Sequence, residues 1–297
     1  MTAPSGLVIV DKPAGLTSHD VVARVRRLAG TRRVGHAGTL DPMATGVLVV
    51  GVEQATRLLG HLALTQKQYA GTVRLGQRTD SDDADGAITA QAPADQVTDA
   101  ALRAAAAVLT GDIEQVPPGI SAIKVGGRRA YKLTREGAPP DLPARPVTID
   151  ELTVTAIRRP GSAGGPPAGL VDADIEVTCS SGTYIRAIAR DLGEALGPGG
   201  HLTALRRTRV GPYRISGALT LDELAASFQV VPLATAAAAA FDRRDLPDEE
   251  ASRVGHGGRL AALGTAGPVA AFAPDGSLVA LLTEEDGQAR SLAVFVG

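Results

Sequence analysis

The feature that most constrains the fold is a strand pattern followed closely by a helix pattern between residues 171 and 196. Apolar and polar residues alternate over residues 171–179, VDADIEVTC, which predicts a half-buried β-strand. Isoleucine and leucine then recur at helical intervals over residues 185–196, and Gly197 ends the predicted helix. Both periods in so short a stretch indicate a chain that packs helices against a sheet.

Strand and helix patterns interleave irregularly along the rest of the chain. Apolar or alternating runs predict four further strands, over residues 6–10, 47–52, 68–75 and 147–156. A break in the alternation of the last run predicts a bulge. Helices are predicted after the capping-box sequence TSHD at residues 17–20 and over residues 99–109, whereas residues 31–46 are predicted to form a structured loop. We therefore expect an α+β fold with a mixed, mainly antiparallel central sheet flanked by helices.

The character of the sequence changes near residue 230. An alanine tract at residues 234–240 predicts a short helix or a linker. Beyond it, short strands are predicted over residues 268–272, 277–282 and 291–296. We expect one domain over residues 1–230 and a small β-rich domain over residues 231–297. Residues 117–146 are rich in proline and glycine at both ends and basic in the middle, so they are predicted to be an insertion in the first domain.

Net charge and charge placement point in opposite directions. The 30 Lys and Arg residues nearly balance the 32 Asp and Glu residues, and a net charge of -2 taken alone argues against a general nucleic-acid binder. The basic residues gather in three blocks, however: residues 12–33 hold six, residues 121–136 hold five and residues 186–214 hold six. Such blocks suit contacts with phosphates. Residues 235–297 are acidic, with nine acids against five bases.

Several classes of site and location are not supported by the composition. No stretch approaches the roughly 20 apolar residues of a membrane span, and the N-terminal sequence reaches Asp11 and Lys12 too soon for a signal peptide, so we expect a cytoplasmic protein. Cys179 is the single cysteine, and the five histidines lack the spacing of a zinc site. The acidic run DSDDAD at residues 80–85 lacks the distal glutamate of a calcium loop. We therefore expect no metal site.

A loop rich in glycine and proline, GHAGTLDPMATG at residues 35–46, surrounds a single carboxylate, Asp41. Glycine permits unusual backbone dihedrals and proline fixes the path, so the loop would hold this side chain in one position. A plain alternative is that Asp41 caps the turn at Pro42. The residue types alone leave both interpretations open.

The same loop, together with VDKPAGLTSHD upstream, closely resembles the catalytic region of the TruB-type tRNA pseudouridine synthases. Three more segments resemble this family in the same order: KQYAGTVRLGQRTDSDDADG, then SAIKVGGRRAYKLTREG, then CSSGTYIRAIARDLGEALG followed by HLTALRRTRVG. The likeness spans residues 6–215. It implies a pseudouridine synthase fold with a PUA-like C-terminal domain, and an enzyme that isomerises uridine 55 in the T-loop of tRNA. The implied reaction needs no cofactor and no metal.

The resemblance implies catalytic roles for three residues. Asp41 resembles the catalytic aspartate, a nucleophile toward the anomeric carbon of the ribose or toward C6 of the base. Arg186 resembles the arginine that pairs with it, and a guanidinium favours the ionised carboxylate that a nucleophile requires. Tyr69 resembles the tyrosine that stacks on the flipped base and is a candidate for taking the C5 proton. From the residue types alone, Arg186 could instead be a solvated helix charge and Tyr69 a core residue.

Four further residues match substrate-binding positions of the family. Tyr184 resembles the second active-site tyrosine, and Leu205 the apolar residue that packs near the base. His36 resembles the histidine that enters the T-loop, although a plain surface histidine is the alternative. Lys12 resembles a lysine near the active site, where it could support the loop or contact a phosphate. Aromatic residues make up only 3% of the chain, so two tyrosines within matching motifs favour a functional role.

The resemblance implies that the partner of the chain is tRNA, contacted through its T-arm. The basic insertion at residues 117–146 would clamp the T-arm, whereas the acidic balance of the C-terminal domain argues against strong phosphate binding there. A non-catalytic tRNA-binding and folding chaperone, and a pseudouridine synthase acting on another RNA, are the alternatives. The lack of long basic extensions favours stand-alone action without a guide RNA, and we expect a monomer.

Overall fold

The structure, a computed structural model, describes residues 3–121, 123–125, 127–129, 133, 136 and 140–296. The chain divides into two units. The first comprises Met1–Pro42, Gly46–Thr65 and Arg209–Gly297, and the second comprises Met43–Thr45 and Gln66–Thr208. Each unit therefore combines segments that are distant in the sequence.

The first unit contains a short sheet in which β1 lies between two other strands. Its strands are β1 (Gly6–Lys12), β2 (Val34–Ala37), β3 (Thr45–Val52) and β14 (Val231–Pro232). The short β13 (Tyr213–Arg214), also in this unit, pairs with Arg209 and Val210. The order is β14-β1-β3, and β2 also pairs with β3. β1 and β3 pair antiparallel from Gly6 opposite Val52 to Lys12 opposite Gly46. Both strands are almost wholly buried, which explains why their sequences are continuous apolar runs rather than alternating ones.

Helices pack around this sheet and fix the loops beside it. They are α1 (Ser18–Ala29), α2 (Leu59–Leu62), α6 (Leu221–Ala226) and α7 (Leu233–Ala240), with the 3₁₀ helices η1 (Glu53–Leu58) and η2 (Ile215–Gly217). Thr17 and Asp20 form a reciprocal capping box at the start of α1, and Gly30 ends the helix with φ +65°. The helix predicted after residues 17–20 is thereby confirmed. None of the described helices is long and apolar enough to cross a membrane.

The C-terminal part of the first unit is a five-stranded sheet with one helix. Its elements are β15 (Asp242–Asp245), α8 (Asp248–Gly255), β16 (Leu260–Ala261), β17 (Val269–Phe272), β18 (Leu278–Glu285) and β19 (Gln288–Val294). The strand order is β15-β17-β18-β19-β16. Val254 of α8 and Val279 of β18 belong to one apolar cluster, and Phe272 shares a second cluster with Ala236 of α7 and Leu7 of β1. The three strands predicted in this region are confirmed, with bounds shifted by a few residues.

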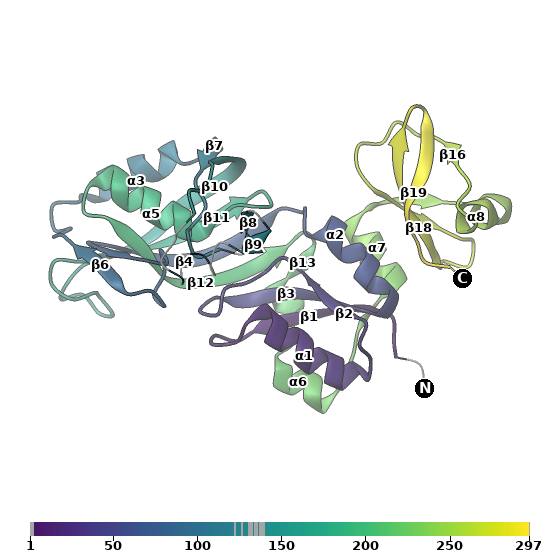
Figure 1. The fold of residues 1–297 in the computed structure, drawn as a ribbon, viewed down its shortest axis with the longest axis horizontal. Helices are drawn as coiled ribbons and strands as arrows, with labels where there is room; N and C mark the ends of the chain where they lie inside the picture. The colour runs from purple at the N-terminus through teal and green to yellow at the C-terminus, as the bar shows by residue number, and fades with distance from the viewer. Residues whose placement is uncertain are drawn as a thin grey trace. The chain divides into compact units, whose positions relative to one another are not determined.

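The second unit is a sheet with two helices over one face, as Figure 1 shows for α3 and α5. The sheet has the order β12-β4-β11-β10-β7, and two short hairpins, β5-β6 and β8-β9, lie outside it. Its elements are β4 (Lys67–Leu75), β5 (Gln77–Thr79), β6 (Ile88–Gln91), α3 (Asp99–Val108), β7 (Gly111–Gln115), β8 (Lys124–Val125), β9 (Arg128–Arg129), β10 (Arg145–Arg158), β11 (Val171–Cys179), α5 (Ile185–Leu196) and β12 (Gly200–Val210). β4 and β11 pair from Lys67 opposite Cys179 to Leu75 opposite Val171. A register shift after Ile149 in the pairing of β10 with β11 confirms the predicted bulge.

The predicted α+β class is confirmed, but β12 was not predicted from the sequence. Three arginines, Arg206, Arg207 and Arg209, interrupt the apolar pattern of this strand. Leu202 and Leu205 are nevertheless buried, and Arg207 is itself only 1% exposed. A buried arginine looks like a surface residue in any pattern of polarity, so the alternation is lost. The loop predicted over residues 31–46 also contains β2, and the insertion predicted over residues 117–146 lies partly outside the described residues.

Candidate active site

The seven site residues predicted from the sequence lie in two groups. The first unit holds Lys12, His36 and Asp41, and the second unit holds Tyr69, Tyr184, Arg186 and Leu205. The residues of the first group come from β1, β2 and the loop between β2 and β3. Those of the second group come from two neighbouring strands, β4 and β12, and from the start of α5.

Asp41 lies in the loop between β2 and β3. The loop begins at Gly38, whose φ of +81° lies in the left-handed region that favours glycine. Two groups from the chain around the end of β1 hold the carbonyl of Pro42: the Gly15 N–H donates to it at 2.8 Å and Lys12 Nζ donates at 3.2 Å. The residue directly after Asp41 is therefore tied to the segment that ends β1.

Lys12 is fully buried despite its charge. Its ammonium donates to three backbone carbonyls, those of Pro13 at 3.0 Å, Leu16 at 2.7 Å and Pro42 at 3.2 Å. Hydrogen bonds from a buried charged group to carbonyls offset part of the cost of removing the charge from water. Of the two roles that the sequence left open for Lys12, this location favours support of the Asp41 loop over contact with a phosphate.

His36 lies on β2, opposite Val50 of β3. Its ring meets the ring of His19 from α1 edge to face, with the ring centroids 5.5 Å apart and an angle of 83° between the planes. This geometry is the one that aromatic quadrupoles favour. The contact links the start of α1 to the strand that leads into the Asp41 loop.

Tyr69 and Leu205 lie on the neighbouring strands β4 and β12, and each is 8% exposed. A Cβ atom built on Gly71 would lie 3.6 Å from Leu205 Cδ1. Because Gly71 and Tyr69 are two residues apart on β4, they share one face of the strand. Leu205 therefore lies on the same face of the sheet as Tyr69, which suits an aromatic and an apolar group that together line one pocket.

Tyr184 directly precedes α5, and a buried glutamine fixes its main chain. The Tyr184 N–H donates to Gln115 Oε1 at 2.8 Å, and Gln115 Nε2 donates to the Tyr184 carbonyl at 3.1 Å. Gln115 is only 2% exposed. Both polar ends of one side chain are thus satisfied by one residue, which fixes where α5 starts. Nothing in the sequence pointed to Gln115, because 69 positions separate it from its partner.

Arg186 is buried and held by three groups of its own unit. Its Nε lies 3.4 Å from Asp83 Oδ2, and the guanidinium donates to the carbonyls of Ser81 at 2.7 Å and Ile120 at 3.0 Å. Asp83 is fixed in turn, because Ser81 Oγ and the Asp85 N–H donate to its Oδ1 at 2.6 and 3.0 Å. Arg186 is therefore not the solvated helix charge that its residue type allowed.

The acidic turn at residues 80–85 anchors a second arginine of α5. Arg190 lies 3.3 Å from Asp82 and 2.8 Å from Asp191, and it donates to the Val116 carbonyl at 2.8 Å. Burial raises the pKa of Asp82, and the charge of Arg190 acts in the opposite direction. Two acids of the run DSDDAD therefore pair with two arginines of α5. The run is a structural clamp on this helix.

Lys67 is a buried charge that the sequence did not single out. It lies on the same face of β4 as Tyr69, two residues away, and is 5% exposed. Burial, and to a smaller extent the charge of Arg207 on β12, lower the pKa of Lys67 to about 8. Two cations thus lie within electrostatic range of each other beside Tyr69 and Leu205.

The lowered pKa of Lys67 predicts how stability depends on pH. Below about pH 8 the ammonium is protonated in both states, so the folded protein bears the full cost of its burial. Between about pH 8 and the ordinary value of 10.5 the folded state releases this proton while the unfolded state keeps it, which stabilises the folded protein. The stability that Lys67→Met gains over the wild type should therefore shrink across this window, by a few kcal/mol at most. Urea unfolding of both proteins from pH 7 to pH 10.5 measures this difference, and a constant difference would contradict the assignment.

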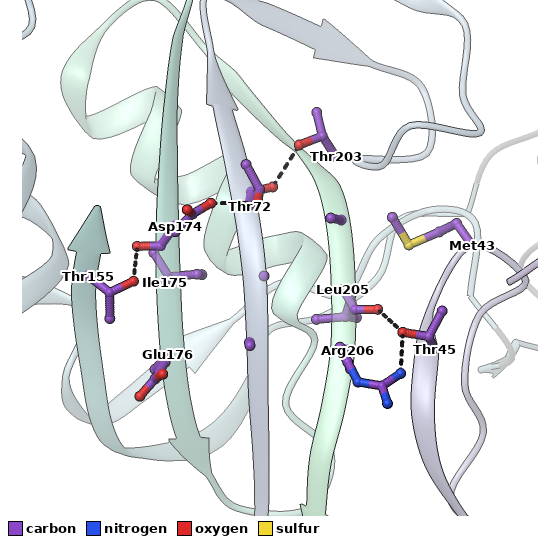
Figure 2. A pocket seen from close by; sticks show the side chains of 13 residues that line it. Met43, Thr45, Thr72, Thr155, Asp174, Ile175, Glu176, Thr203, Leu205 and Arg206 are labelled. Carbon is purple, nitrogen blue, oxygen red and sulfur yellow. Dashed lines mark hydrogen bonds between the residues drawn. The ribbon is translucent and has the colours of Figure 1, made fainter. Parts of the chain in front are cut away.

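A groove of about 540 Å³ in the second unit includes one of these residues, Leu205, in its lining (Figure 2). It is lined by Met43, Thr45, Ala70, Gly71, Thr72, Thr155, Asp174, Ile175, Glu176, Thr203, Ala204, Leu205 and Arg206. Thr45 Oγ1 donates to the Leu205 carbonyl at 3.4 Å and accepts from Arg206 at 3.3 Å. These two bonds tie the chain four residues after Asp41 to β12. Across the groove, Thr72 Oγ1 donates to Asp174 Oδ1 at 2.7 Å.

Metal-binding clusters are absent from the part of the chain that the structure describes. No group of three or more His, Cys, Asp or Glu side chains among those residues is arranged to hold an ion. The acidic turn uses Asp82 and Asp83 to pair with arginines, as described above. Burial raises the pKa of the Cys179 thiol to about 11, so this thiol is protonated at neutral pH.

Comparison with protein families gives three matches along the chain. Residues 26–185 match the family described as "TruB family pseudouridylate synthase (N terminal domain)". Residues 186–247 match "tRNA pseudouridylate synthase B C-terminal domain", and residues 241–296 match "tRNA Pseudouridine synthase II, C terminal". The first match alone covers more than half of the chain.

Individual relatives are similar over nearly their full length. The chain is 62% identical to tRNA pseudouridine synthase B of Thermobifida fusca, over 98% of this chain and 99% of the relative. It is 58% identical to tRNA pseudouridine synthase B of Streptomyces coelicolor, over 99% and 98% of the two chains. Among solved structures, a Cbf5-Nop10-Gar1 complex contains a chain that is 25% identical, with a TM-score of 0.73 over 98% of this chain and 84% of that one. A chain of an H/ACA RNP bound to a substrate RNA shares the fold, with a TM-score of 0.71 at 23% identity over 98% and 85% of the two chains.

Proposed function

Because the chain belongs to the TruB family of pseudouridylate synthases, we propose that it isomerises uridine 55 in the T-loop of tRNA to pseudouridine. The chain is 62% identical, over nearly the full length of both proteins, to a relative named tRNA pseudouridine synthase B, and this observation carries the choice of tRNA as substrate. The choice of position 55 rests on the motifs around Asp41, Tyr69 and Arg186.

The proposed reaction moves one bond and one proton. The bond from C1′ of the ribose to N1 of uracil breaks, the base rotates, and C1′ bonds to C5. The proton on C5 then leaves and N1 gains one, so that atoms balance without a redox step. Asp41 acts as the nucleophile, at C1′ or at C6, and forms the covalent intermediate that lets the base rotate.

Arg186 orients the nucleophile in this proposal. A guanidinium near a carboxylate can hold it through two parallel hydrogen bonds. The pairing of Arg186 with Asp83 and with two carbonyls supports this role, because these contacts fix the guanidinium before substrate arrives. Preorganised charge costs no reorganisation during the reaction.

The target uridine must leave the RNA stack before it reacts, which costs a few kcal/mol. We propose that Tyr69 stacks on the extruded base, that Leu205 packs against it, and that Tyr184 completes the pocket. The shared face of Tyr69 and Leu205 supports this arrangement. His36 then enters the T-loop, and Lys12 supports the Asp41 loop through its hydrogen bond to the Pro42 carbonyl.

Tyr69 offers a test that separates stacking from proton transfer. Tyr69→Leu should lower kcat/KM by about 10- to 100-fold, because an aromatic–base stack contributes about 1–3 kcal/mol. Tyr69→Phe keeps the ring and should bind RNA like the wild type. If the phenol takes the C5 proton, Tyr69→Phe should release tritium from 5-tritiated uridine about 100-fold more slowly. Tritium release by Tyr69→Phe at the wild-type rate would show that the Tyr69 phenol does not take the C5 proton.

The remaining features of the proposal concern organisation. We propose that residues 1–230 form the catalytic domain, that the insertion at residues 117–146 contacts the T-arm, and that residues 231–297 form a PUA-like domain. The separate family match at residues 241–296 supports the last assignment. The enzyme would act in the cytoplasm as a monomer, without guide RNA or protein partners.

An isolated T-arm hairpin tests this proposal directly. Purified protein, with a chelator present and no other RNA or protein, should convert the uridine that corresponds to position 55. A protein that binds and refolds tRNA without converting any uridine would instead be a chaperone. Conversion that requires an added guide RNA would indicate a different RNA substrate.

A further inference from the structure

Ser18, the first residue of α1, holds the main chain of the residue before Asp41. Ser18 Oγ donates to the Leu40 carbonyl at 3.1 Å and accepts from the Leu40 N–H at 2.9 Å. Ser18 is 1% exposed and Leu40 is 3% exposed, so water does not compete for these bonds. One hydroxyl thus satisfies both backbone groups of residue 40, which no spacing in the sequence could show, since 22 positions separate the pair.

The first turn of α1, which carries Ser18, is fixed by a capping box and by burial. In the capping box that begins α1, the Asp20 N–H donates to Thr17 Oγ1 at 3.1 Å and the Thr17 N–H donates to Asp20 Oδ2 at 2.9 Å. A reciprocal cap fixes the first turn of the helix. Val21 and Val25 are buried on the inner face of the same helix. The hydroxyl of Ser18 is therefore held at a set place relative to β1 and the loop.

The residue on the other side of Asp41 is held from the same segment. The Pro42 carbonyl accepts from the Gly15 N–H at 2.8 Å and from Lys12 Nζ at 3.2 Å. Leu40 and Pro42, the two neighbours of Asp41, are thus both anchored to residues 12–18. With its backbone fixed on both sides, the Asp41 side chain has only its own rotamers left to adopt.

We propose that Ser18 is a positioning residue for Asp41: its paired hydrogen bonds to Leu40 set the place from which the carboxylate attacks. This inference rests on the proposed function in one respect, the role of Asp41 as nucleophile. A nucleophile displaced by about 1 Å can lose about 100-fold in rate, because reacting atoms must meet at close to contact distance. Ser18 does not touch the substrate in this account.

The neighbouring residue, His19, provides an internal comparison. His19 contacts the ring of His36 on β2, whereas Ser18 contacts Leu40 in the loop that follows β2, so these two neighbouring residues of α1 make separate contacts. Loss of the Ser18 hydroxyl should lower kcat and leave KM for RNA near the wild-type value. Loss of the His19 ring should do the reverse, because His36 is proposed to contact the T-loop.

The experiment compares Ser18→Ala, His19→Ala and Val22→Ala in the full-length protein with a T-arm hairpin. Val22 is 4% exposed on the same helix but bonds to no part of the loop, so its variant controls for loss of stability. We expect Ser18→Ala to lower kcat by about 10- to 100-fold, and Val22→Ala to keep kcat within about threefold below its unfolding temperature. Hydrogen exchange of the Leu40 amide, measured without RNA, should become at least about tenfold faster in Ser18→Ala only.

Two results would overturn the proposal. One is a Ser18→Ala variant with the kcat of Val22→Ala, and the other is a Leu40 amide that stays protected without the hydroxyl. Failure of the proposed function is a separate result, since it shows in the wild type. If the wild type converted a uridine other than 55, the proposed site of modification would be wrong. The effect of Ser18→Ala on kcat could still be measured at the uridine that is converted. If no RNA were converted, the exchange of Leu40 would still decide whether Ser18 anchors the loop.

Discussion

Replacing Asp41 with asparagine should abolish pseudouridine formation while leaving the fold and RNA binding intact. Both routes open to the nucleophile, attack at C1′ and attack at C6, need a carboxylate, and a neutral amide supports neither. We expect turnover to fall by at least about 1,000-fold, as when other enzymes lose a covalent nucleophile. Pseudouridine measured by mass spectrometry in a treated T-arm hairpin gives the rate.

Two controls accompany this variant. Asn has nearly the shape of Asp, and the loop is anchored through the main chain of Pro42, so the unfolding temperature should stay within about 2 °C. Asp41→Ala guards against slow deamidation of the asparagine back to aspartate. Turnover at the wild-type rate in both variants would exclude Asp41 as the nucleophile.

Replacing Arg186 with methionine should cost both activity and stability. The change leaves the Asp83 carboxylate buried without its ion pair, and it leaves the Ser81 and Ile120 carbonyls without their donor. Breaking one partner of a buried ion pair typically costs about 3–5 kcal/mol. If Arg186 also orients Asp41, turnover should fall by at least about 100-fold. Urea unfolding and single-turnover kinetics at 15 °C measure the two effects separately.

Arg190→Met is the matched control for this prediction. Arg190 lies four residues farther along α5 and pairs with Asp82 and Asp191, so its loss also breaks ion pairs with the acidic turn. Its side chain is 19% exposed against 4% for Arg186, and it has no proposed contact with the nucleophile. Arg190→Met should destabilise the protein less and keep turnover within about fivefold of the wild type. Equal loss of turnover in Arg186→Met and Arg190→Met would show that Arg186 has a structural role only.

The sequence predicted most of the long strands and helices of the fold because their apolar periods are strong. The alternating run at residues 171–179 and the helix at 185–196 were found at the bounds that the structure gives. β12 was missed because it buries Arg207. Periodicity treats every arginine as exposed, so a strand that carries a buried cation cannot be recognised from polarity alone.

Only the site residues that lie within sequence motifs could be predicted; the residues that hold them in place could not. Asp41, Tyr69 and Arg186 stand in recognisable segments, whereas the groups that hold them come from elsewhere. Ser18 acts on Leu40 across 22 positions, and Gln115 holds α5 across 69. Hydrogen bonds between distant segments depend on the folded path of the chain, and no local spacing encodes them.

The acidic turn and the net charge illustrate the same point. DSDDAD at residues 80–85 is unremarkable as a surface turn, yet its Asp82 and Asp83 pair with two arginines of α5. Part of the negative charge that nearly balances the basic blocks therefore lies on carboxylates that form ion pairs inside the protein. Net charge thus says little about an RNA partner, and the placement of charge says more.

Position-resolved mapping of pseudouridine on a pool of unmodified tRNA tests the central claim most directly. The wild-type protein alone should add one new pseudouridine, at position 55, to tRNAs that carry uridine there, and Asp41→Asn should add none. Conversion at other positions with uridine 55 unchanged would contradict the account, as would complete absence of conversion by a folded wild-type protein that binds the T-arm.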